Sequence, residues 1–472
     1  MMPHEAISVL SGIINDEALI DHAQIIHNSF TRKRKISLDN LLNYLIFRNH
    51  DVLSEDLVSY FGALRDFDIP TRQAMIKRMS ILNYDVWDFI MDRFRNEIYN
   101  ELPLINFMDY IVIAVDGSFL DLPPHIALNH YFGGHQTSKM KISDIKKPQT
   151  KVSMIYDVLN KVILDFSISH YKTSEIPLLF KHLKKLQEFF RDKKIILLAD
   201  RYYGSAELFR YCEMHNIKYL VRAKKNFFKH YIEKHEGEKD FNVNIKLDKA
   251  WIRRIKNDKV RKSIDEDPKM DIRVVRGTYT YNEKNKKKDR EVTVETQYFT
   301  NLDEGFDIAD IIDLYHHERW NVENAYDVLK NSLNIEQYNT HNPIGIINET
   351  MGKVIFYNIE QIIFIESRKR IKQNKKCKYE YIPNNKYIIN LLHHNDFIVS
   401  FKMKTVDKIV ETIISTGAKE KISVRKGRHY KRWNKFFKSI PKTRHRIDGR
   451  RNPPVAKGKA GFVTTNHWIQ PL

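Results

Sequence analysis

Residues 1–105 place apolar side chains at helical spacing. Ser37, Ser54 and Thr71 each stand just before an amphipathic stretch, where a side-chain oxygen can accept a hydrogen bond from a free backbone N–H. This part of the chain is therefore predicted to be a helical N-terminal domain.

The stretch Ile69–Phe94 predicts two short helices joined by a turn near Asn83. Arg72, Lys77 and Arg78 place three cations on the first of these helices. Such a face would suit a DNA-binding module, although any small helical bundle shows the same pattern. We expect this N-terminal domain to bind DNA.

The pattern changes near Tyr110, where short apolar runs replace the helical spacing. Tyr110–Val115 is an apolar run that ends in Asp116-Gly117, which predicts a buried strand followed by a turn. Lys151–Ser169 predicts two antiparallel strands that are joined at Asn160-Lys161.

A helix capped near Thr173 or Ser174 follows, and then come the strand Lys193–Asp200, a helix from about Ser205, and the strand Lys218–Ala223. This succession predicts a mixed α/β fold with a partly antiparallel sheet. It is the order of a ribonuclease H-like core, whose first three strands are antiparallel and whose next strand is parallel.

Residues 227–301 are β-rich and look like an insertion into the α/β unit. Two strand-forming stretches flank the lysine-containing turn Asn282–Asp289, which predicts a hairpin. A long amphipathic helix is predicted from about Asp307 to Asn334. We therefore expect a ribonuclease H-like domain over residues 106–370 and a separate basic region over 371–472.

Positive charge is concentrated near the C-terminus. The chain has 79 Lys/Arg against 59 Asp/Glu, a formal net charge of +20. Residues 371–472 alone contain 24 Lys/Arg and 6 Asp/Glu, a net charge of +18. Such a surplus predicts a polyanionic partner, because each neutralised phosphate releases condensed counterions. Charge alone leaves DNA, RNA and an anionic membrane surface open.

Length and composition exclude several classes of protein. A chain of 472 residues, 42% hydrophobic and 29% charged, suits a soluble protein of several domains. Cys212 and Cys377 cannot build a disulfide framework or a cysteine-rich zinc site. The N-terminus lacks a secretory pattern, and no segment is apolar enough to span a bilayer. We expect a cytoplasmic protein without a membrane partner.

Two aspartates follow strands that should be neighbours in the sheet. Asp116 ends one predicted strand and Asp200 ends another. Both side chains can therefore point into one crevice, where hard divalent cations favour oxygen ligands. Either residue alone is more often a turn or helix-start residue.

The helix Asp307–Asn334 adds a third carboxylate. Its apolar seam comprises Val322, Ala325, Tyr326, Leu329 and Leu333. Arg319, Glu323 and Lys330 fall within a narrow arc beside that seam. A solvated ion-pair face is the usual reason for such a pattern. Beside a packed seam, however, a half-buried carboxylate can complete a metal site while the cations hold phosphates.

With these motifs, the sequence resembles the bacterial insertion-sequence transposases of the DDE class, in the fourth insertion-sequence family with its Tyr-Arg-Glu-Lys signature. That family places Arg three intervening residues before Glu and Lys six after it, and Arg319–Lys330 has both spacings. The segments IVIAVDGSFLDLP around Asp116 and IILLADRYYGSAELFRYCEMHNIKYLVRAK around Asp200 resemble the other two motifs. The resemblance covers roughly residues 109–226 and 301–361.

The resemblance implies a cut-and-paste DNA transposase. Asp116, Asp200 and Glu323 would be its catalytic carboxylates and would bind Mg²⁺ or Mn²⁺, as two ions about 3.5–4 Å apart. The 3′-hydroxyl of a cut transposon end would then attack target DNA. The partners implied are double-stranded DNA and a second copy of the chain in a synaptic dimer. A bacterial, nucleoid-associated location follows, and residues 371–472 would contribute DNA contact, dimerisation or both.

The resemblance also assigns residues that would contact DNA. Arg319 and Lys330 would hold phosphates near the scissile bond. The family's tyrosine precedes the arginine by two intervening residues, and here that position is His316, with Tyr315 one place earlier. Both lie near Arg319 on a helix, and Tyr315 is the favoured DNA contact.

Two other functions stay open. A ribonuclease H-like nuclease would use the same carboxylates, but it would need neither recognition of transposon ends nor strand transfer. A domesticated DNA-binding descendant would need no chemistry. The presence of all three candidate carboxylates argues against the second of these.

Overall fold

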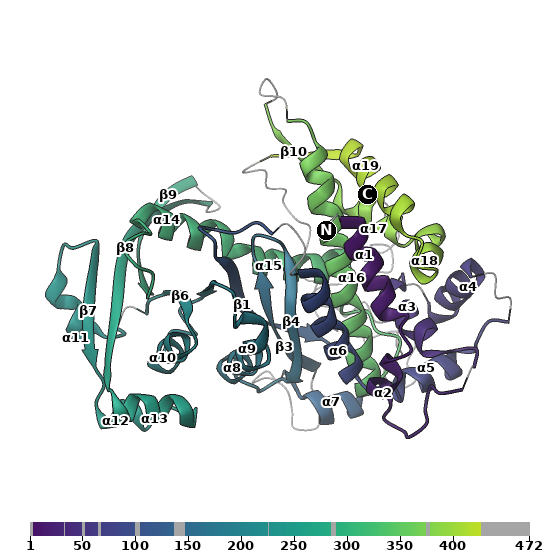
Figure 1. Ribbon diagram of the computed structural model, residues 1–472, viewed down its shortest axis with the longest axis horizontal. Helices are drawn as coiled ribbons and strands as arrows, with labels where there is room; N and C mark the ends of the chain where they lie inside the picture. The colour runs from purple at the N-terminus through teal and green to yellow at the C-terminus, as the bar shows by residue number, and fades with distance from the viewer. Residues whose placement is uncertain are drawn as a thin grey trace, which may run out of the picture.

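The computed structural model describes residues 3–425 apart from 33, 50–51, 65–67, 100–103, 136–146, 225, 285–288 and 374–377. A large mixed sheet is extended at one end by a β-rich segment, and helices from both ends of the chain gather beside the other (Figure 1). The predicted mixed α/β class is confirmed. No helix in the described ranges is both long and apolar enough to cross a membrane. The tip of the lysine-containing turn and the tail from residue 426 lie outside the described residues.

The core of the sheet is built around its first strand. In chain order the core strands are β1 (Ile111–Asp121), β3 (Lys147–Asp157), β4 (Val162–His170), β5 (Ile195–Ala199) and β6 (Ile217–Arg222). Strand β3 pairs antiparallel with β1 and β4, and β5 runs parallel to β1 and β6. The order β4-β3-β1-β5-β6 is consistent with the expected ribonuclease H-like core. The β3–β4 hairpin turns at the predicted Asn160-Lys161, where Lys161 has a φ of 55°.

Strand β1 is longer than its apolar run predicts. It continues through Asp116 and Gly117 to Asp121, and Asp116 is paired with Met154 of β3. The predicted turn at Asp116-Gly117 is therefore wrong. The polar residues stay in the strand because β3 offers hydrogen-bonding partners along their whole length.

The connections between core strands form as predicted. Helices α8 (Glu175–Lys185) and α9 (Gln187–Phe190) lead to β5, and α10 (Ala206–Met214) leads to β6. Ser174 is the residue before α8. The Ser205 hydroxyl accepts a hydrogen bond from the Leu208 N–H and caps α10. The short elements α7 (Ile126–Phe132) and β2 (Gly134–His135) lie beside β3.

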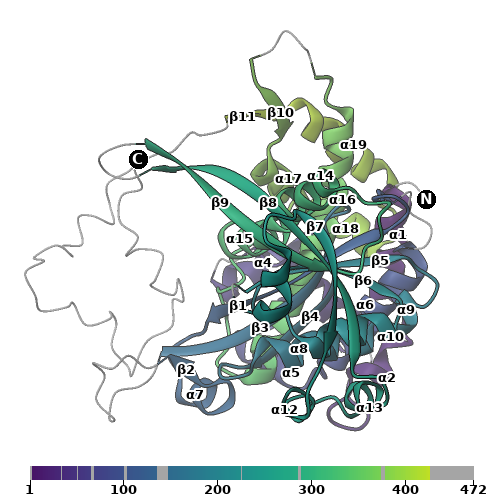
Figure 2. The ribbon, with the colours of Figure 1, turned by 90° about the vertical axis from the view of Figure 1, so that its left-hand side faces the viewer.

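The β-rich segment extends the same sheet beyond β6. Its strands are β7 (Asp240–Lys246), β8 (Lys269–Lys284) and β9 (Asp289–Thr300), in the order β6-β9-β8-β7. The predicted hairpin is confirmed as β8 and β9, which run together as a long ribbon (Figure 2). Its helical elements are α11 (Lys229–Ile232), η2 (Glu233–His235), α12 (Lys249–Ile252) and α13 (Asp258–Glu266).

The predicted helix Asp307–Asn334 forms with two π turns. Its parts are α14 (Ile308–Asp313), the π turn η3 (Leu314–Glu318), α15 (Trp320–Asp327) and the π turn η4 (Val328–Ser332). Asp307 caps it by accepting a hydrogen bond from the Asp310 N–H at 2.7 Å. All five residues of the predicted seam are buried. Each π turn changes the direction of the side chains relative to a regular α-helix, and such turns are frequent at functional sites.

The chain before β1 is helical, as predicted. Its elements are α1 (Pro3–Ile14), α2 (Leu19–Ala23), α3 (Leu38–Phe47), α4 (Leu53–Ala63), α5 (Arg72–Ser80), α6 (Asp85–Phe94) and the π turn η1 (Arg95–Tyr99). Ser37 and Thr71 occupy the N-cap positions of α3 and α5, as predicted. The Thr71 hydroxyl accepts from the Ala74 N–H, whereas Ser37 makes no side-chain cap bond. The prediction for Ser54 is wrong, because α4 begins one residue earlier, after Val52.

Helix α16 (Pro343–Arg370) lies at the centre of the molecule (Figure 1). It is buried around most of its circumference and packs against β4, α3, α5 and α19. The Asn358 amide donates to the Ile163 carbonyl at 3.0 Å and accepts from the Ile163 N–H at 2.9 Å, so it takes the place of a neighbouring strand at the edge of β4. The remaining elements are β10 (Glu380–Pro383), α17 (Asn385–Leu392), α18 (Asn395–Lys402), α19 (Asp407–Lys419) and β11 (Lys421–Val424). The predicted domain boundaries at 105 and 370 stay predictions.

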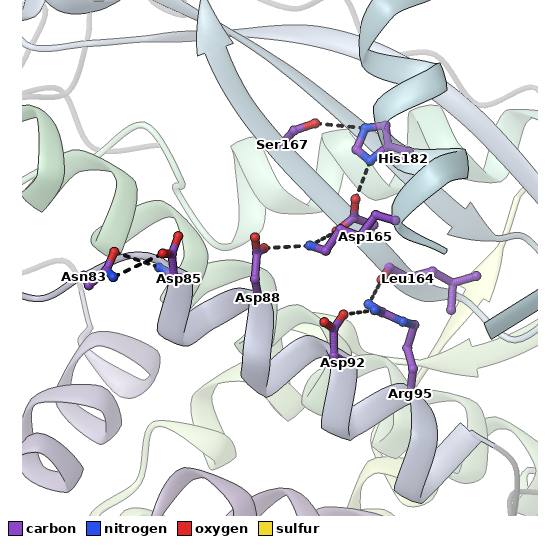
Figure 3. A network of polar contacts seen from close by, with 10 residues as sticks. Asn83, Asp85, Asp88, Asp92, Arg95, Leu164, Asp165, Ser167 and His182 are labelled. Carbon is purple, nitrogen blue, oxygen red and sulfur yellow. Dashed lines mark hydrogen bonds and ion pairs between the residues drawn. The ribbon is translucent and has the colours of Figure 1, made fainter. Parts of the chain in front are cut away.

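A buried polar network joins α6, β4 and α8 (Figure 3). The Asp165 carboxylate lies 2.6 Å from His182 Nδ1 and accepts from Lys185 Nζ at 2.7 Å, and Lys185 also contacts Asp88 at 2.7 Å. Burial raises the pKa of Asp165, but His182 and Lys185 outweigh it and hold that pKa well below its usual range. Ser167 Oγ lies 2.9 Å from His182 Nε2, which completes a Ser-His-Asp arrangement. Because Ser167 is only 9% exposed, we assign the network to fastening the N-terminal helices, not to nucleophilic catalysis.

Candidate active site

The pairing of β1 with β5 brings the two predicted aspartates to the same level of the sheet. Ala114 of β1 is the partner of Leu198 of β5. Continuing this register by two residues sets Asp116 opposite Asp200, the first residue after β5. Adjacent strands lie about 4.8 Å apart, and residues at one level of a parallel pair point to the same face. The two carboxylates therefore belong to one region of the sheet.

Helix α15 brings Glu323 toward β1. The Tyr326 hydroxyl donates to the Asp116 carbonyl at 3.0 Å and fixes the helix against the strand at that residue. Glu323 is half-buried, and its Oε1 accepts from Arg319 Nη2 at 2.7 Å. Arg319 is 8% exposed, and its guanidinium lies 5.7 Å from the centre of the Tyr315 ring. Its Nε atom is buried and has no hydrogen-bond partner among the described residues.

The carboxyl group of Asp116 lies in an environment that shifts its pKa. Burial, followed by the negative charge of Glu323, raises its pKa to about 7, while Arg319 acts in the opposite direction. A pKa this high means that the surroundings of the carboxyl group stabilise its negative charge less well than water does. Asp116 and Glu323 are thus close enough to interact electrostatically, and their shared catalytic role stays a prediction.

Lys330 lies on the same side of β1. Its Nζ donates to Ser118 Oγ at 2.7 Å, and burial lowers its pKa. Ser118 is two residues after Asp116 and so faces the same side of the strand. Arg319, Glu323 and Lys330 thus line one side of the helix beside β1, as the predicted arc requires.

Tyr315 and His316 are both engaged inside the protein. Tyr315 is 3% exposed, and its hydroxyl donates to the carbonyl of Ala199 at 3.3 Å, next to Asp200. His316 is half-buried, and its Nε2 lies 2.5 Å from the Tyr298 hydroxyl of β9. The DNA contact assigned to these residues stays a prediction, and in this structure they support the ends of β5 and β9.

Sequence reasoning missed a fourth carboxylate, Glu175, on the opposite face of β1. Its Oε2 accepts from the Tyr203 hydroxyl at 2.9 Å, and its Oε1 forms an ion pair with Lys151 of β3. A Cβ atom at Gly117 would stand 2.6 Å from the Glu175 Cδ, so only glycine leaves room for this approach. Glu175 also contributes to the raised pKa of Asp116. The only sequence signal is the Asp116-Gly117 pair, which predicts a turn.

A family model described as a transposase DDE domain matches residues 108–359, more than half of the chain. The match begins just before β1 and includes Asp116, Asp200 and Glu323. The chain belongs to the DDE transposase family. The finer assignment to the fourth insertion-sequence family stays a prediction.

Two other comparisons add little to the family assignment. No curated protein matches the chain. Seven chains of solved structures match, among them the piggyBac transposase synaptic complex with hairpin DNA. That match has 12% identity and a TM-score of 0.38, and it covers 87% of this chain and 84% of that one. A likeness at this TM-score carries no argument about function.

The donor chemistry of this DDE domain suits a divalent cation. Asp116, Asp200 and Glu323 offer the oxygen ligands that Mg²⁺ and Mn²⁺ prefer, and a cation would offset the charge that raises the pKa of Asp116. Within the described ranges, however, no three acidic, His or Cys side chains are close enough to form a ready-made metal site. Glu323 is paired with Arg319, so a cation would have to draw Glu323 away from that partner.

The cations of α5 do not all face outward. Arg78 donates from Nε and Nη2 to the Ile36 carbonyl at 3.1 and 2.9 Å, and its guanidinium lies 4.1 Å from the centre of the Phe30 ring. Arg72 and Lys77 are exposed. The predicted DNA-binding face of this helix therefore has two outward cations and one that packs inside. Its DNA-binding role stays a prediction.

Proposed function

We propose that this DDE transposase-family protein cuts DNA at the ends of a mobile element and joins the freed ends to target DNA. The observation that carries the proposal is the shared level of Asp116, in β1, and Asp200, directly after the adjacent β5, with Glu323 close enough to help raise the pKa of Asp116. Family membership makes nuclease and strand-transferase chemistry the expected activity.

Each carboxylate has a role that follows from its position. Asp116 stays in strand β1, where its pairing with Met154 of β3 holds its backbone in place. Asp200 lies at a strand end, where its Oδ1 accepts from the Tyr202 N–H at 2.7 Å and leaves Oδ2 for a ligand. Glu323 can exchange Arg319 for a cation on a half-exposed helix face. A divalent cation bound by these groups would supply the charge that activates the attacking hydroxyl and offsets charge on the leaving oxygen.

The two cations of the signature are placed to hold phosphate. When Glu323 turns toward a cation, the Arg319 fork is released, and its unpartnered Nε becomes available as a second donor. Lys330 can exchange the Ser118 hydroxyl for a phosphate oxygen with little movement. We assign Tyr315 and His316 to supporting this helix, and through it the contact with the DNA end.

The proposal extends to partners and location. The partner is double-stranded DNA, both the element's ends and the target, held by two copies of the chain in a cut-and-paste reaction. Residues 1–105 would contribute to end recognition, and residues 371–472 to DNA contact or dimerisation. The proposal implies that the protein is bacterial, cytoplasmic and associated with the nucleoid, and that it belongs to the fourth insertion-sequence family.

Cleavage of a supercoiled plasmid that carries the element's own ends tests the proposal. With Mg²⁺ or Mn²⁺, the protein should excise the element and give joined products. Nicking that ignores the ends and gives no joining would favour a ribonuclease H-like nuclease. Binding without any cutting would favour a domesticated DNA-binding protein.

A further inference from the structure

The C-terminal ribbon of β10 and β11 has two chemically different faces. The strands pair antiparallel, with Tyr381 opposite Ser423 and Pro383 opposite Lys421. Because alternate residues of a strand point to opposite sides, these four residues share one face. Continuing the register adds Tyr379 and Arg425 to this face, which we call the tyrosine face, and leaves Glu380 and Ile422 on the other.

Cations cover the rings of the tyrosine face. Lys421 Nζ lies 4.9 Å from the centre of the Tyr381 ring, and the Arg425 guanidinium lies 5.3 Å from that of Tyr379. Arg425 Nε also donates to Ser423 Oγ at 3.1 Å. These contacts hold two long cationic side chains in place while Lys421 and Arg425 remain exposed. These two side chains have therefore already lost part of their conformational entropy before a partner binds.

The two cations of this face are not paired with acidic residues. Within the described part of the chain, neither Lys421 nor Arg425 has a carboxylate partner. Two arginines outside this face are paired: Arg368 with Glu380 at 2.8 Å, and Arg370 with Glu411. The tyrosine face is thus a place where positive charge is left uncompensated.

The ribbon is also firmly attached to the rest of the protein. The Gln373 amide donates to the Tyr381 carbonyl at 2.7 Å and accepts from the Tyr381 N–H at 3.1 Å. Strand β10 packs against α16 and α19. Directly after Arg425, residues 426–472 contain 13 Lys/Arg and one acidic residue in the sequence. In the sequence, the β11 strand of the tyrosine face therefore directly precedes the most basic segment of the chain.

We propose that the tyrosine face binds the phosphate backbone of duplex DNA through Lys421 and Arg425. Their backbones are four residue steps apart on one strand, roughly 13 Å in an extended chain. The two cations can therefore contact separate phosphates of the duplex. The inference rests on the proposed function, since a transposase must hold duplex DNA beyond its catalytic carboxylates.

The test is the salt dependence of binding between the full chain and a fluorescein-labelled DNA duplex of mixed sequence. The double variant Lys421→Ala/Arg425→Ala should lower the slope of log K against log salt by about 2, because two phosphate contacts are lost. The control Lys386→Ala/Lys408→Ala removes the same charge from exposed positions of α17 and α19 and should keep the wild-type slope. All variants should melt at the wild-type temperature, which shows that the fold is intact.

The outcomes separate this inference from the proposed function. If wild type and control bind DNA and the Lys421/Arg425 variant keeps their slope, the ribbon is not a DNA contact, while the transposase proposal stands. If wild type does not bind duplex DNA, both proposals fail. If the double variant loses binding to phosphatidylserine vesicles but not to DNA, the face serves a membrane surface and the inference is wrong.

Discussion

Replacing Gly117 by alanine should destabilise the protein through Glu175 on the opposite side of the sheet from Glu323. A methyl group at this position would stand 2.6 Å from Glu175 Cδ and 2.8 Å from its Cγ and Oε1. The carboxylate cannot simply rotate away, because it holds the Lys151 ammonium and the Tyr203 hydroxyl.

The size of the effect follows from these contacts. Moving Glu175 costs two contacts with a charged carboxylate, one to the Tyr203 hydroxyl and one to the Lys151 ammonium, each worth about 1.5–3 kcal/mol. The Lys151 side chain is only 8% exposed, so water replaces little of what is lost. We therefore expect Gly117→Ala to lower the free energy of unfolding by about 3–6 kcal/mol.

Urea unfolding followed by circular dichroism measures this change. Gly62→Ala is the matched control, because a Cβ there meets no atom within 4 Å and alanine suits helix α4. The control should be as stable as wild type or about 1 kcal/mol more stable. Glu175→Ala should itself destabilise the protein, since it leaves Lys151 buried without its partner.

A double-mutant cycle decides whether Glu175 is the cause. If the clash with Glu175 produces the loss, Gly117→Ala should add almost nothing in the Glu175→Ala background. The reasoning is refuted if Gly117→Ala unfolds at the wild-type midpoint, or if its cost is the same with and without the Glu175 side chain.

Three further changes test other parts of the structure. Lys330→Gln should lower the DNA cleavage rate roughly ten- to hundredfold, the equivalent of one charge-assisted contact, and a normal rate in a plasmid assay would contradict its phosphate role. Asn348→Ala removes the buried side chain that accepts from Trp87 Nε1 at 2.7 Å and donates to two carbonyls. Calorimetry should show that the free energy of unfolding falls by about 3 kcal/mol. An unchanged melting temperature would count against this packing of α16. Asp165→Asn should cost about 3–5 kcal/mol at pH 7. Because the folded-state pKa of Asp165 is lowered, this stabilisation is present above about pH 4 and is lost below it. The stabilities of wild type and variant should therefore converge in acid. A stability difference that does not change with pH would argue against the ion pair.

Local patterns predicted the parts of the fold that depend on local physics. The hairpin turn at Asn160-Lys161, the caps Ser37 and Thr71, and the buried seam of the helix near Glu323 follow from residue preferences and periodicity. The spacing of Arg319, Glu323 and Lys330 also survives in three dimensions, because one continuous helical run carries all three.

Features that depend on distant partners could not be predicted. Asp116 stays in strand β1 because β3 pairs with it, which the Asp-Gly pair does not reveal. Glu175 approaches β1 only because Gly117 lacks a side chain. Tyr315 is buried within a π turn, and spacing at 100° per residue cannot anticipate the change of helix phase there.

Helix α16 shows the same limit on a larger scale. Its sequence includes Glu349 and Lys353, which suggest a surface, yet both are buried. Arg48 of the N-terminal region lies 2.8 Å from Glu349 and its carbonyl accepts from Lys353 Nζ at 2.6 Å. The partners are about 300 positions away in the sequence, so no local pattern can link them.

The most direct test of the central claim compares DNA cutting by wild type and by Glu323→Gln, Asp116→Asn and Asp200→Asn. The substrate is a plasmid with the element's own ends, and Asp327→Asn, an exposed carboxylate on the same helix, is the control. Wild type and control should cut and join DNA, and the three variants should lose both activities while DNA binding persists. Wild-type cutting by Glu323→Gln would contradict the assignment of this carboxylate to the active site.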